Sequence, residues 1–311
     1  MITASSGRIS VCIVCRNEAD RLGACLESVQ WADEVVVMDL SSDDTSREVA
    51  ANYGAHVVVH SPVPIVEVVR NLVAEHATGE WILALDPDER VTPGLARQLR
   101  IASRRSDIDV VAIPVMNFDF GHPARAVLHR YDPKPRMYRK GSISWPTTPN
   151  DLPDLVDVRV HRVPATDDLV LVHDRNRTIP EALERVLRYA PAEAEARLAA
   201  GEVFTARRMV GKVTQKAYKQ FVHARSLEEG MPGMIRAFIL ASFDFYVWAC
   251  FWQLSGAKRT PEDDLYLRRL ALPLRLLQVS MAVRHRIGVA RARLVTRWSR
   301  SYAAARRRTT S

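Results

Sequence analysis

Short apolar runs alternate along the first 115 residues with segments whose apolar residues recur at helical spacing. Such runs are typical of buried strands, and the intervening spacing is typical of helices. Strands are predicted at residues 9–14, 34–39, 56–60, 81–85 and 109–115, and helices around 22–29 and at 45–53, 67–76 and 93–103. Because strands and helices alternate with short connections, we predict an α/β fold with a doubly wound, mostly parallel sheet covered on both faces.

Polar clusters follow three of these predicted strands. Arg16–Glu18 comes after the first strand, Asp39 ends the second, and Asp86–Glu89 follows the fourth. Ligand sites in open α/β sheets form outside the carboxyl ends of the strands. We therefore expect the three clusters to converge on one site.

The pattern changes after residue 125. Residues 125–173 are rich in proline and favour loops and hairpins over helices. Helical spacing returns at 181–189, 191–200 and about 204–225. We predict a division into residues 1–175, a helical region 176–260 and a tail 261–311.

Composition fits a folded protein of a reducing compartment. The chain of 311 residues is 47% hydrophobic and has four cysteines, too few for a secreted disulfide framework. Cys12 and Cys15 form a CxxC within the first strand, where this spacing points them to opposite faces and disfavours metal or redox chemistry. No long apolar stretch precedes that strand, so we expect no signal peptide and a cytoplasmic location.

The net charge of +8 belongs to the tail. Twelve of the 44 basic residues, all arginine, lie in 265–311 with no acidic residue, so residues 1–264 hold 32 basic and 36 acidic residues. Leucines, valines and Trp298 are interleaved with the arginines, as in basic interfacial helices. We predict that the C-terminal helices bind an anionic membrane surface at the inner face of the cell membrane, and no recognised nucleic-acid-binding motif accompanies them.

Met234–Leu254 is long enough to invite a transmembrane assignment. Arg236 and Asp244 argue against it, because a charge at the centre of a spanning helix costs about 2.5–3.5 kcal/mol. An interfacial helix is favoured, with Phe238, Phe245, Trp248 and Trp252 on or near one side. Burial against the catalytic domain and a contact between copies in a homo-oligomer remain alternatives.

Asp86 and Asp88 are two carboxylates with one residue between them, at a strand end. Mg²⁺ and Mn²⁺ prefer oxygen ligands and often take one or two protein carboxylates, with substrate phosphates completing the shell. The spacing alone is more typical of a solvated acidic turn, so a metal site here depends on the surrounding sequence.

The surrounding sequence resembles the family 2 glycosyltransferases, most strongly the branch similar to lipopolysaccharide core glucosyltransferases. The motifs that carry the resemblance occur in family order and spacing over roughly residues 9–95. They are ISVCIVCRNE at 9–18, WADE at 31–34, VVMDLSSDDT at 36–45, Arg70-Asn71 and WILALDPDER at 81–90.

The resemblance implies a GT-A fold, with the nucleotide-sugar site at about 9–95 and the acceptor side at about 110–175. It implies a nucleotide pocket lined by Val14–Glu18, with Asp39 on the base or ribose and Arg70 facing the nucleotide or diphosphate. It also implies that Asp88 binds Mg²⁺ or Mn²⁺ and that Asp86 holds ribose or a metal-bound water. Local roles remain open: Glu18 can cap a helix, Asp39 can begin an Asx turn, and Arg70 can pair with Glu67.

Inverting transfer also needs a general base near the acceptor hydroxyl. In the resembling branch an acid that follows a histidine fills this role, and the corresponding positions here are Asn150 and Asp151, a departure from the family pattern. Asp154 is the competing candidate, and a simple turn is the structural alternative. His173, which matches a family histidine, is a candidate third metal ligand or an ordinary hydrogen-bonding histidine.

These expectations describe an inverting glycosyltransferase that takes sugar from a nucleotide-sugar donor, UDP-linked by default. The acceptor would be a lipid-linked sugar, glycolipid or polysaccharide precursor. One alternative is a sugar-nucleotide nucleotidyltransferase, although the glycine-rich phosphate loop of such enzymes is missing after the first strand. The other is a degenerate GT-A domain that acts as a membrane-associated interaction module.

Overall fold

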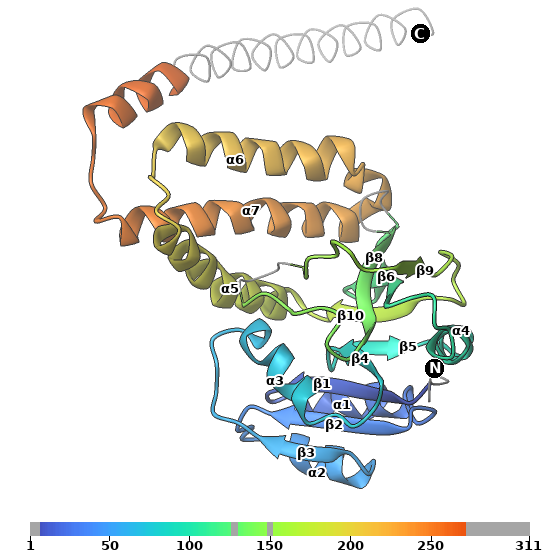
Figure 1. Ribbon diagram of the computed structural model, residues 1–311. Helices are drawn as coiled ribbons and strands as arrows, with labels where there is room; N and C mark the ends of the chain where they lie inside the picture. Colours follow the sequence, from blue (N-terminus) through green and yellow to red (C-terminus); the bar gives the residue numbers. More distant parts are fainter. Residues whose placement is uncertain (1–6, 126–129, 148–151, 272–311) are drawn as a thin grey trace, which may run out of the picture. The chain divides into compact units, whose positions relative to one another are not determined.

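The computed structural model describes residues 7–125, 130–147 and 152–271 (Figure 1). The chain divides into two compact units, Met1–Phe204 with Gly211–Gly256, and Thr205–Val210 with Ala257–Ser311. The sheet and the site described below belong to the first unit. Within the second unit, residues 261–271 form a helix.

The N-terminal half of the sheet has the predicted parallel arrangement. Its strands are β1 (Ile9–Cys15), β2 (Glu34–Asp39), β3 (His56–Val59) and β4 (Trp81–Leu85), in the order β3-β2-β1-β4. All three neighbouring pairs are parallel. The connections are α1 (Ala19–Glu27), α2 (Ser46–Asn52), and the 3₁₀ turn η1 (Val66–Val69) with α3 (Arg70–Glu75). The helix predicted at 67–76 thus begins as a 3₁₀ turn.

The other half of the sheet is mixed. After β4 come β5 (Glu89–Val91), α4 (Pro93–Ser103), β6 (Val110–Asp119), β7 (His122–Pro123), β8 (Arg130–Arg139), β9 (Val160–Arg162) and β10 (Leu171–Asn176). The sheet continues from β4 in the order β8-β6-β10-β5, with β8 antiparallel to both of its neighbours. Pro133 and Pro135 lie inside β8, whose pairing with β6 shifts register at two points. Such irregularities accommodate a residue that lacks a backbone N–H.

Two hydrophobic clusters cover the two faces of the sheet, as expected for a doubly wound fold. Alternate residues of β1 enter different clusters: Ile9, Val11, Ile13 and Cys15 pack with α1 and α4, and Cys12 and Val14 pack with α3. The two cysteines of the CxxC therefore face opposite sides, and burial raises the pKa of each thiol to about 12. This separation agrees with the interpretation of the CxxC as part of the core.

The helical region begins with one long helix, α5 (Ile179–Ala199). The sequence predicted two helices, because an internal proline removes a hydrogen bond and crowds the preceding turn. That prediction is wrong: Pro191 lies inside a continuous helix. The region continues with α6 (Ala206–Tyr218), a π-helical turn η2 (Lys219–His223), a 3₁₀ turn η3 (Ser226–Glu229) and α7 (Gly230–Leu254).

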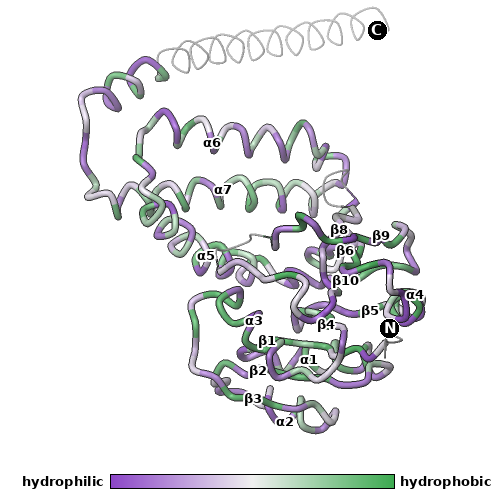
Figure 2. Tube along the Cα trace, viewed as in Figure 1, coloured by the Kyte–Doolittle hydropathy of each residue, from purple (hydrophilic) through white to green (hydrophobic). Residues whose placement is uncertain are grey.

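α7 is hydrophobic along most of its length (Figure 2) and packs against α5. Near its start, Arg236 is buried and its guanidinium lies 3.6 Å from Asp119 of β6 and 2.6 Å from Glu229. Trp248, expected on or near the same side of the helix as Phe238, is buried beside Phe251, whereas Phe238 is 61% exposed. The aromatic residues of α7 are therefore divided between the core and the surface.

Candidate active site

The acidic segment after β4 is fixed by two short strands. Asp86-Pro87-Asp88 forms a turn between β4 and β5, and β5 pairs with β10 so that Glu89 lies opposite His173. The backbone N–H of Asp174 donates to the carbonyl of Asp88 at 2.9 Å. This pairing brings His173, which is distant in the sequence, to the DxD turn at the carboxyl end of β4.

Two arginines hold the carboxylate of Asp86. Arg70 of α3 donates to Oδ1 at 2.6 Å, and Arg136 of β8 donates to Oδ2 at 2.8 Å. Arg136 also donates to the fully buried Glu89 at 2.6 Å. Burial alone would raise the pKa of Asp86, but Arg70 and Arg136 outweigh it and hold this pKa well below its ordinary value. Asp86 is therefore an anion with both oxygens engaged.

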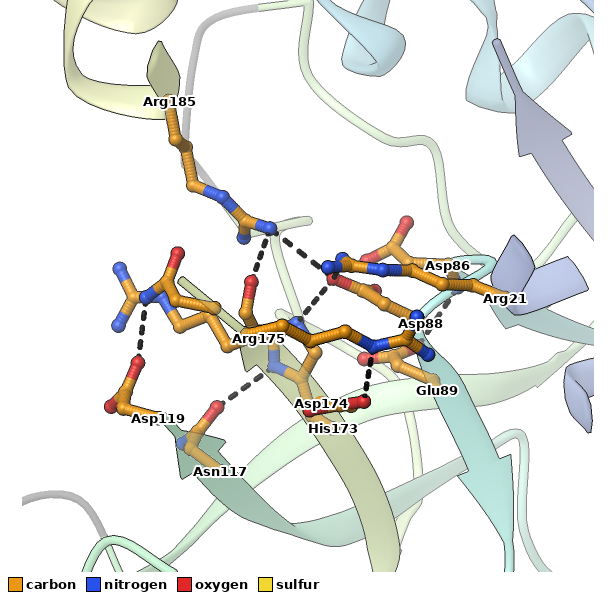
Figure 3. Close-up of polar contacts among 12 residues, drawn as sticks. Arg21, Asp86, Asp88, Glu89, Asn117, Asp119, His173, Asp174, Arg175 and Arg185 are labelled. Atoms are coloured by element: carbon orange, nitrogen blue, oxygen red, sulfur yellow. Dashed lines mark hydrogen bonds and ion pairs between the residues drawn. The ribbon is translucent and has the colours of Figure 1, made fainter. Parts of the chain in front are cut away.

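Three basic side chains surround the buried carboxylate of Asp88 (Figure 3). Its Oδ2 lies 3.3 Å from Nε2 of His173, 3.2 Å from Nη2 of Arg185 and 3.7 Å from Nη1 of Arg21. Burial opposes ionisation, but His173 and Arg185 lower the pKa of Asp88 to about 2. Burial conversely disfavours the charged imidazole, yet Asp88 raises the pKa of His173 above its ordinary value.

The donor set at Asp88 fits a hard divalent cation. Nδ1 of His173 donates to Oδ1 of Asn117 in β6 at 2.8 Å, so in the neutral ring Nε2, on the side of Asp88, would be free to bind a cation. Within the described ranges no group of three or more His, Cys, Asp or Glu residues converges as a metal site. Asp88 and His173 would thus supply two ligands, and substrate phosphate and water would supply the others.

The loops after β1 and β2 are tied together by hydrogen bonds. The backbone N–H groups of Asn17 and Glu18 donate to the hydroxyls of Ser42 and Ser46, each at 2.9 Å. Asn17 has a positive φ of 55°, and its side-chain oxygen accepts from the N–H of Asp43. Val14 is buried at the end of β1 and Arg16 is exposed.

The structure decides the local alternatives considered for three of these residues. The carboxylate of Asp39 accepts from the N–H of Ser42 at 3.0 Å, so Asp39 does form a turn there. Glu18 precedes α1 but its side chain makes no capping hydrogen bond. Arg70 pairs with Asp86, so a pairing with Glu67 is not what positions it.

Glu18 connects the first loop electrostatically to the DxD turn. Burial, followed by the charge of Asp88, raises the pKa of Glu18 to about 7. Asp39 is fully buried and lies 3.5 Å from Nε of Arg47. The carboxyl ends of β1 and β4 are thus close enough for their charges to interact, as the expected convergence of the polar clusters requires.

The structure does not describe the residue predicted to be the general base. Asp151, together with Asn150, lies outside the described residues. Asp154 is exposed, and its Oδ1 accepts from the N–H of Val156 at 3.0 Å, which makes it part of a local turn.

Four site residues escaped the sequence interpretation: Arg21, Asn117, Arg136 and Arg185. Arg136 begins the RMYRKG segment at 136–141, but nothing local marks it as a partner of Asp86. Arg21 and Arg185 lie on α1 and α5 and look like ordinary surface charges of amphipathic helices. Only the tertiary structure directs them to Asp88.

Residues 10–154 match the family model described as glycosyl transferase family 2. An uncharacterized glycosyltransferase of Rickettsia felis is 30% identical over 134 residues, which cover 42% of this chain and 44% of that protein. The uncharacterized glycosyltransferase YibD of Escherichia coli is 32% identical over 114 residues, which cover 34% of this chain and 33% of YibD. The chain thus spans less than half the length of either curated relative.

Among solved structures, the chain is similar to the mannosyltransferase PcManGT from Pyrobaculum calidifontis in complex with GDP-Man and Mn²⁺. The alignment covers 86% of this chain and 80% of that chain, with 15% identity and a TM-score of 0.43.

The segment at residues 10–154, just under half of the chain, is similar to glycosyltransferase family 2. This match supports the predicted resemblance to family 2 and agrees with the predicted GT-A type of α/β fold.

Proposed function

We propose that this protein is an inverting, metal-dependent glycosyltransferase that transfers a sugar from a nucleotide-sugar donor. The observation that carries the proposal is the approach of Asp88 Oδ2 and His173 Nε2 to 3.3 Å at the carboxyl end of β4. These two side chains would hold Mg²⁺ or Mn²⁺. The bound cation would stabilise the negative charge that the nucleoside diphosphate gains as the glycosidic bond breaks.

The other residues of the site would bind and orient the donor. We assign the nucleotide to Val14, Arg16, Asn17, Glu18 and Asp39 at the ends of β1 and β2. Asp86 would act on the ribose or a metal-bound water, and its pairs with Arg70 and Arg136 keep it ionised and fixed in orientation. Arg70 has a second support, because its guanidinium lies 5.2 Å from the centroid of the Trp145 ring.

Asp151 remains our candidate for the base that deprotonates the acceptor hydroxyl. The turn-forming contact of Asp154 makes it the weaker candidate, because its carboxylate already accepts a backbone hydrogen bond. The proposed division of labour is a catalytic domain at 1–175, a helical region at 176–260 and a basic tail at 261–311.

Donor binding is the first property to measure. We expect one of UDP, GDP or dTDP to raise the thermal unfolding temperature, and only when Mn²⁺ is present. Calorimetry on the same protein would give the affinity for each nucleotide and identify the nucleobase of the donor, with UDP as the default expectation. If none of the three nucleotides binds with Mn²⁺ or Mg²⁺, the transferase proposal is wrong and the interaction-module alternative gains support.

We also propose that the acceptor is lipid-linked or a saccharide precursor met at an anionic membrane surface. Phe238 and Phe245 of α7 are 61% and 47% exposed. By length and composition Ser226–Leu254 could cross a membrane, with 28% of its most apolar window buried. The buried pair between Arg236 and Asp119 instead favours a helix whose first turns lie against the sheet. Most of the arginine tail, residues 272–311, lies outside the described residues.

Vesicle sedimentation tests the proposed contact between the basic tail and an anionic membrane surface. We expect the full chain to bind vesicles that contain anionic lipid, and binding to weaken as salt rises, because the attraction is between arginines and headgroups. Truncation after Asp264 should remove most of the binding, and neutral vesicles are the control. Unchanged binding by the truncated chain would exclude the tail as the membrane contact.

A further inference from the structure

Arg185 of α5 reaches the acidic turn from outside the segment that matches the family. Its Nη2 lies 3.2 Å from Asp88 Oδ2 and donates to the carbonyl of Arg175 at 2.7 Å. The family match ends at residue 154, whereas α5 begins at Ile179. The helical region therefore contributes a guanidinium to the candidate metal ligand.

The start of α5 is anchored beside the site, which fixes where Arg185 lies. Thr178 caps the helix by accepting from the N–H of Glu181, whose carboxylate forms an ion pair with Arg21 of α1. Arg177 joins the same region through Asp20, at 2.7 Å. Arg185 follows about two turns after the cap, so its backbone is held although its side chain is 27% exposed.

Asp88 is the one carboxylate that Arg185 contacts, and Asp88 is shared with other basic groups. His173 and Arg21 also approach Asp88, although Arg21 has a second partner in Glu181. Asp86 and Glu89 are already paired with Arg70 and Arg136. Among the described residues, Nε of Arg185 is buried and has no hydrogen-bond partner. A buried N–H without an acceptor is rare and indicates a missing partner. An anion that accepts from Arg185 would satisfy this N–H.

We propose that Arg185 binds the diphosphate of the nucleotide-sugar donor. While no metal is bound, the guanidinium of Arg185 would stay paired with Asp88. Arg185 and the divalent cation would compete for Asp88 Oδ2. When the cation occupies Asp88, the guanidinium is released to donate to phosphate oxygens, a geometry that its planar fork suits. Metal and donor binding are then coupled through a residue of α5. This inference rests on the transferase proposal, because it assigns a residue to the same donor site.

The coupling predicts opposite effects on two ligands, which a purely structural role would not produce. In Arg185→Gln, Mn²⁺ alone should bind about 3–10-fold more tightly, because a competing cation has left Asp88. At saturating Mn²⁺, the nucleoside diphosphate that the wild type prefers should bind about 10–100-fold more weakly, because a charged hydrogen-bond donor is lost. Arg185→Lys should restore part of this affinity, since it keeps the charge but not the fork.

The experiment is calorimetric titration of the full chain with Mn²⁺ alone, and then with UDP or GDP in excess Mn²⁺. Arg188→Gln is the matched control: it makes the same change at an exposed side chain about one turn further along α5, where the guanidinium lies 5.4 Å from the centroid of the Tyr189 ring, and should alter neither affinity. Thermal unfolding of each variant checks that it is folded.

Two outcomes would overturn the assignment while the donor site stands. If the wild type binds the nucleotide and Arg185→Gln binds it equally well, Arg185 does not contact the diphosphate. If Arg185→Gln weakens Mn²⁺ and nucleotide alike, Arg185 only supports the fold of the site. If the wild type binds neither UDP nor GDP with Mn²⁺, the transferase proposal and this one fail together.

Discussion

Replacing Asp88 with asparagine is expected to abolish metal-dependent nucleotide binding and to lower sugar transfer by about 10³-fold or more, the scale of losing the main electrostatic stabilisation of a leaving group. Asp88 is the carboxylate at which His173 Nε2 and two guanidinium groups converge. Asparagine keeps the shape of the side chain but has no charge, so its amide oxygen binds a hard divalent cation much more weakly than a carboxylate does. Calorimetry with Mn²⁺ and nucleotide, followed by donor turnover, measures both effects.

Asp107→Asn is the control for this substitution. Asp107 pairs with Arg105 at 2.6 Å and its side chain is 66% exposed, so it tests the loss of a carboxylate away from the DxD turn. This variant should bind nucleotide as the wild type does. The Asp88→Asn protein must be shown to be folded, because three basic groups then lose their shared anion. Wild-type affinity for Mn²⁺ and nucleotide in a folded Asp88→Asn protein would remove Asp88 from the metal site.

The sequence correctly predicted those parts of the site that depend on the order of neighbouring residues along the chain. The apolar runs gave β1, β2 and β4 nearly residue by residue, because a strand buried on both faces needs an unbroken apolar run. The DxD turn was visible for the same reason: it directly follows such a run. Its connection to His173 was anticipated only through the family resemblance, since the β5–β10 pairing joins residues at least 80 positions apart.

The arginines of the site could not be predicted in the same way. Arg70, Arg136 and Arg185 come from α3, β8 and α5, and the contacts they make depend on how these elements pack. A long flexible side chain carries no periodic signal that reveals its partner. The break predicted at Pro191 was wrong for a related reason. Helix propensity is a local preference that tertiary packing can override, and α5 continues through the proline.

The role of α7 shows how a charged residue changes the interpretation of an apolar helix. Arg236 first served as an argument against a spanning helix, from composition alone. The structure supplies its partner, Asp119 at the end of β6, whose other oxygen accepts from Asn176 at 2.6 Å. One buried charge cluster thus joins β6, β10 and α7, and explains why an arginine stands in an otherwise hydrophobic helix.

Arg136→Met is expected to lower the free energy of unfolding by about 3–5 kcal/mol at neutral pH, the loss typical of removing one partner from a buried ion pair. Among the described residues, the substitution leaves the fully buried carboxylate of Glu89 with one hydrogen-bond donor, the N–H of Asp86. Asp86 is affected less because it keeps Arg70. Urea denaturation of both proteins measures the difference, and Arg97→Met, which breaks an exposed pair with Asp168, should change stability by about 0.5 kcal/mol or less.

The dependence of this loss on pH identifies its cause. Burial already raises the pKa of Glu89 above its ordinary value of 4.5, and Arg136 opposes that rise. Without Arg136 the folded-state pKa must rise further, so the folded protein binds a proton that the unfolded chain has released. An acid whose pKa is raised by folding destabilises the protein above that pKa, and the penalty disappears as pH falls to 4.5. The deficit of Arg136→Met should therefore shrink on acidification, and Glu89→Gln in the same chain should recover much of it at neutral pH. A deficit that is independent of pH and persists in the double variant would show that Arg136 stabilises the site through packing, not through charge.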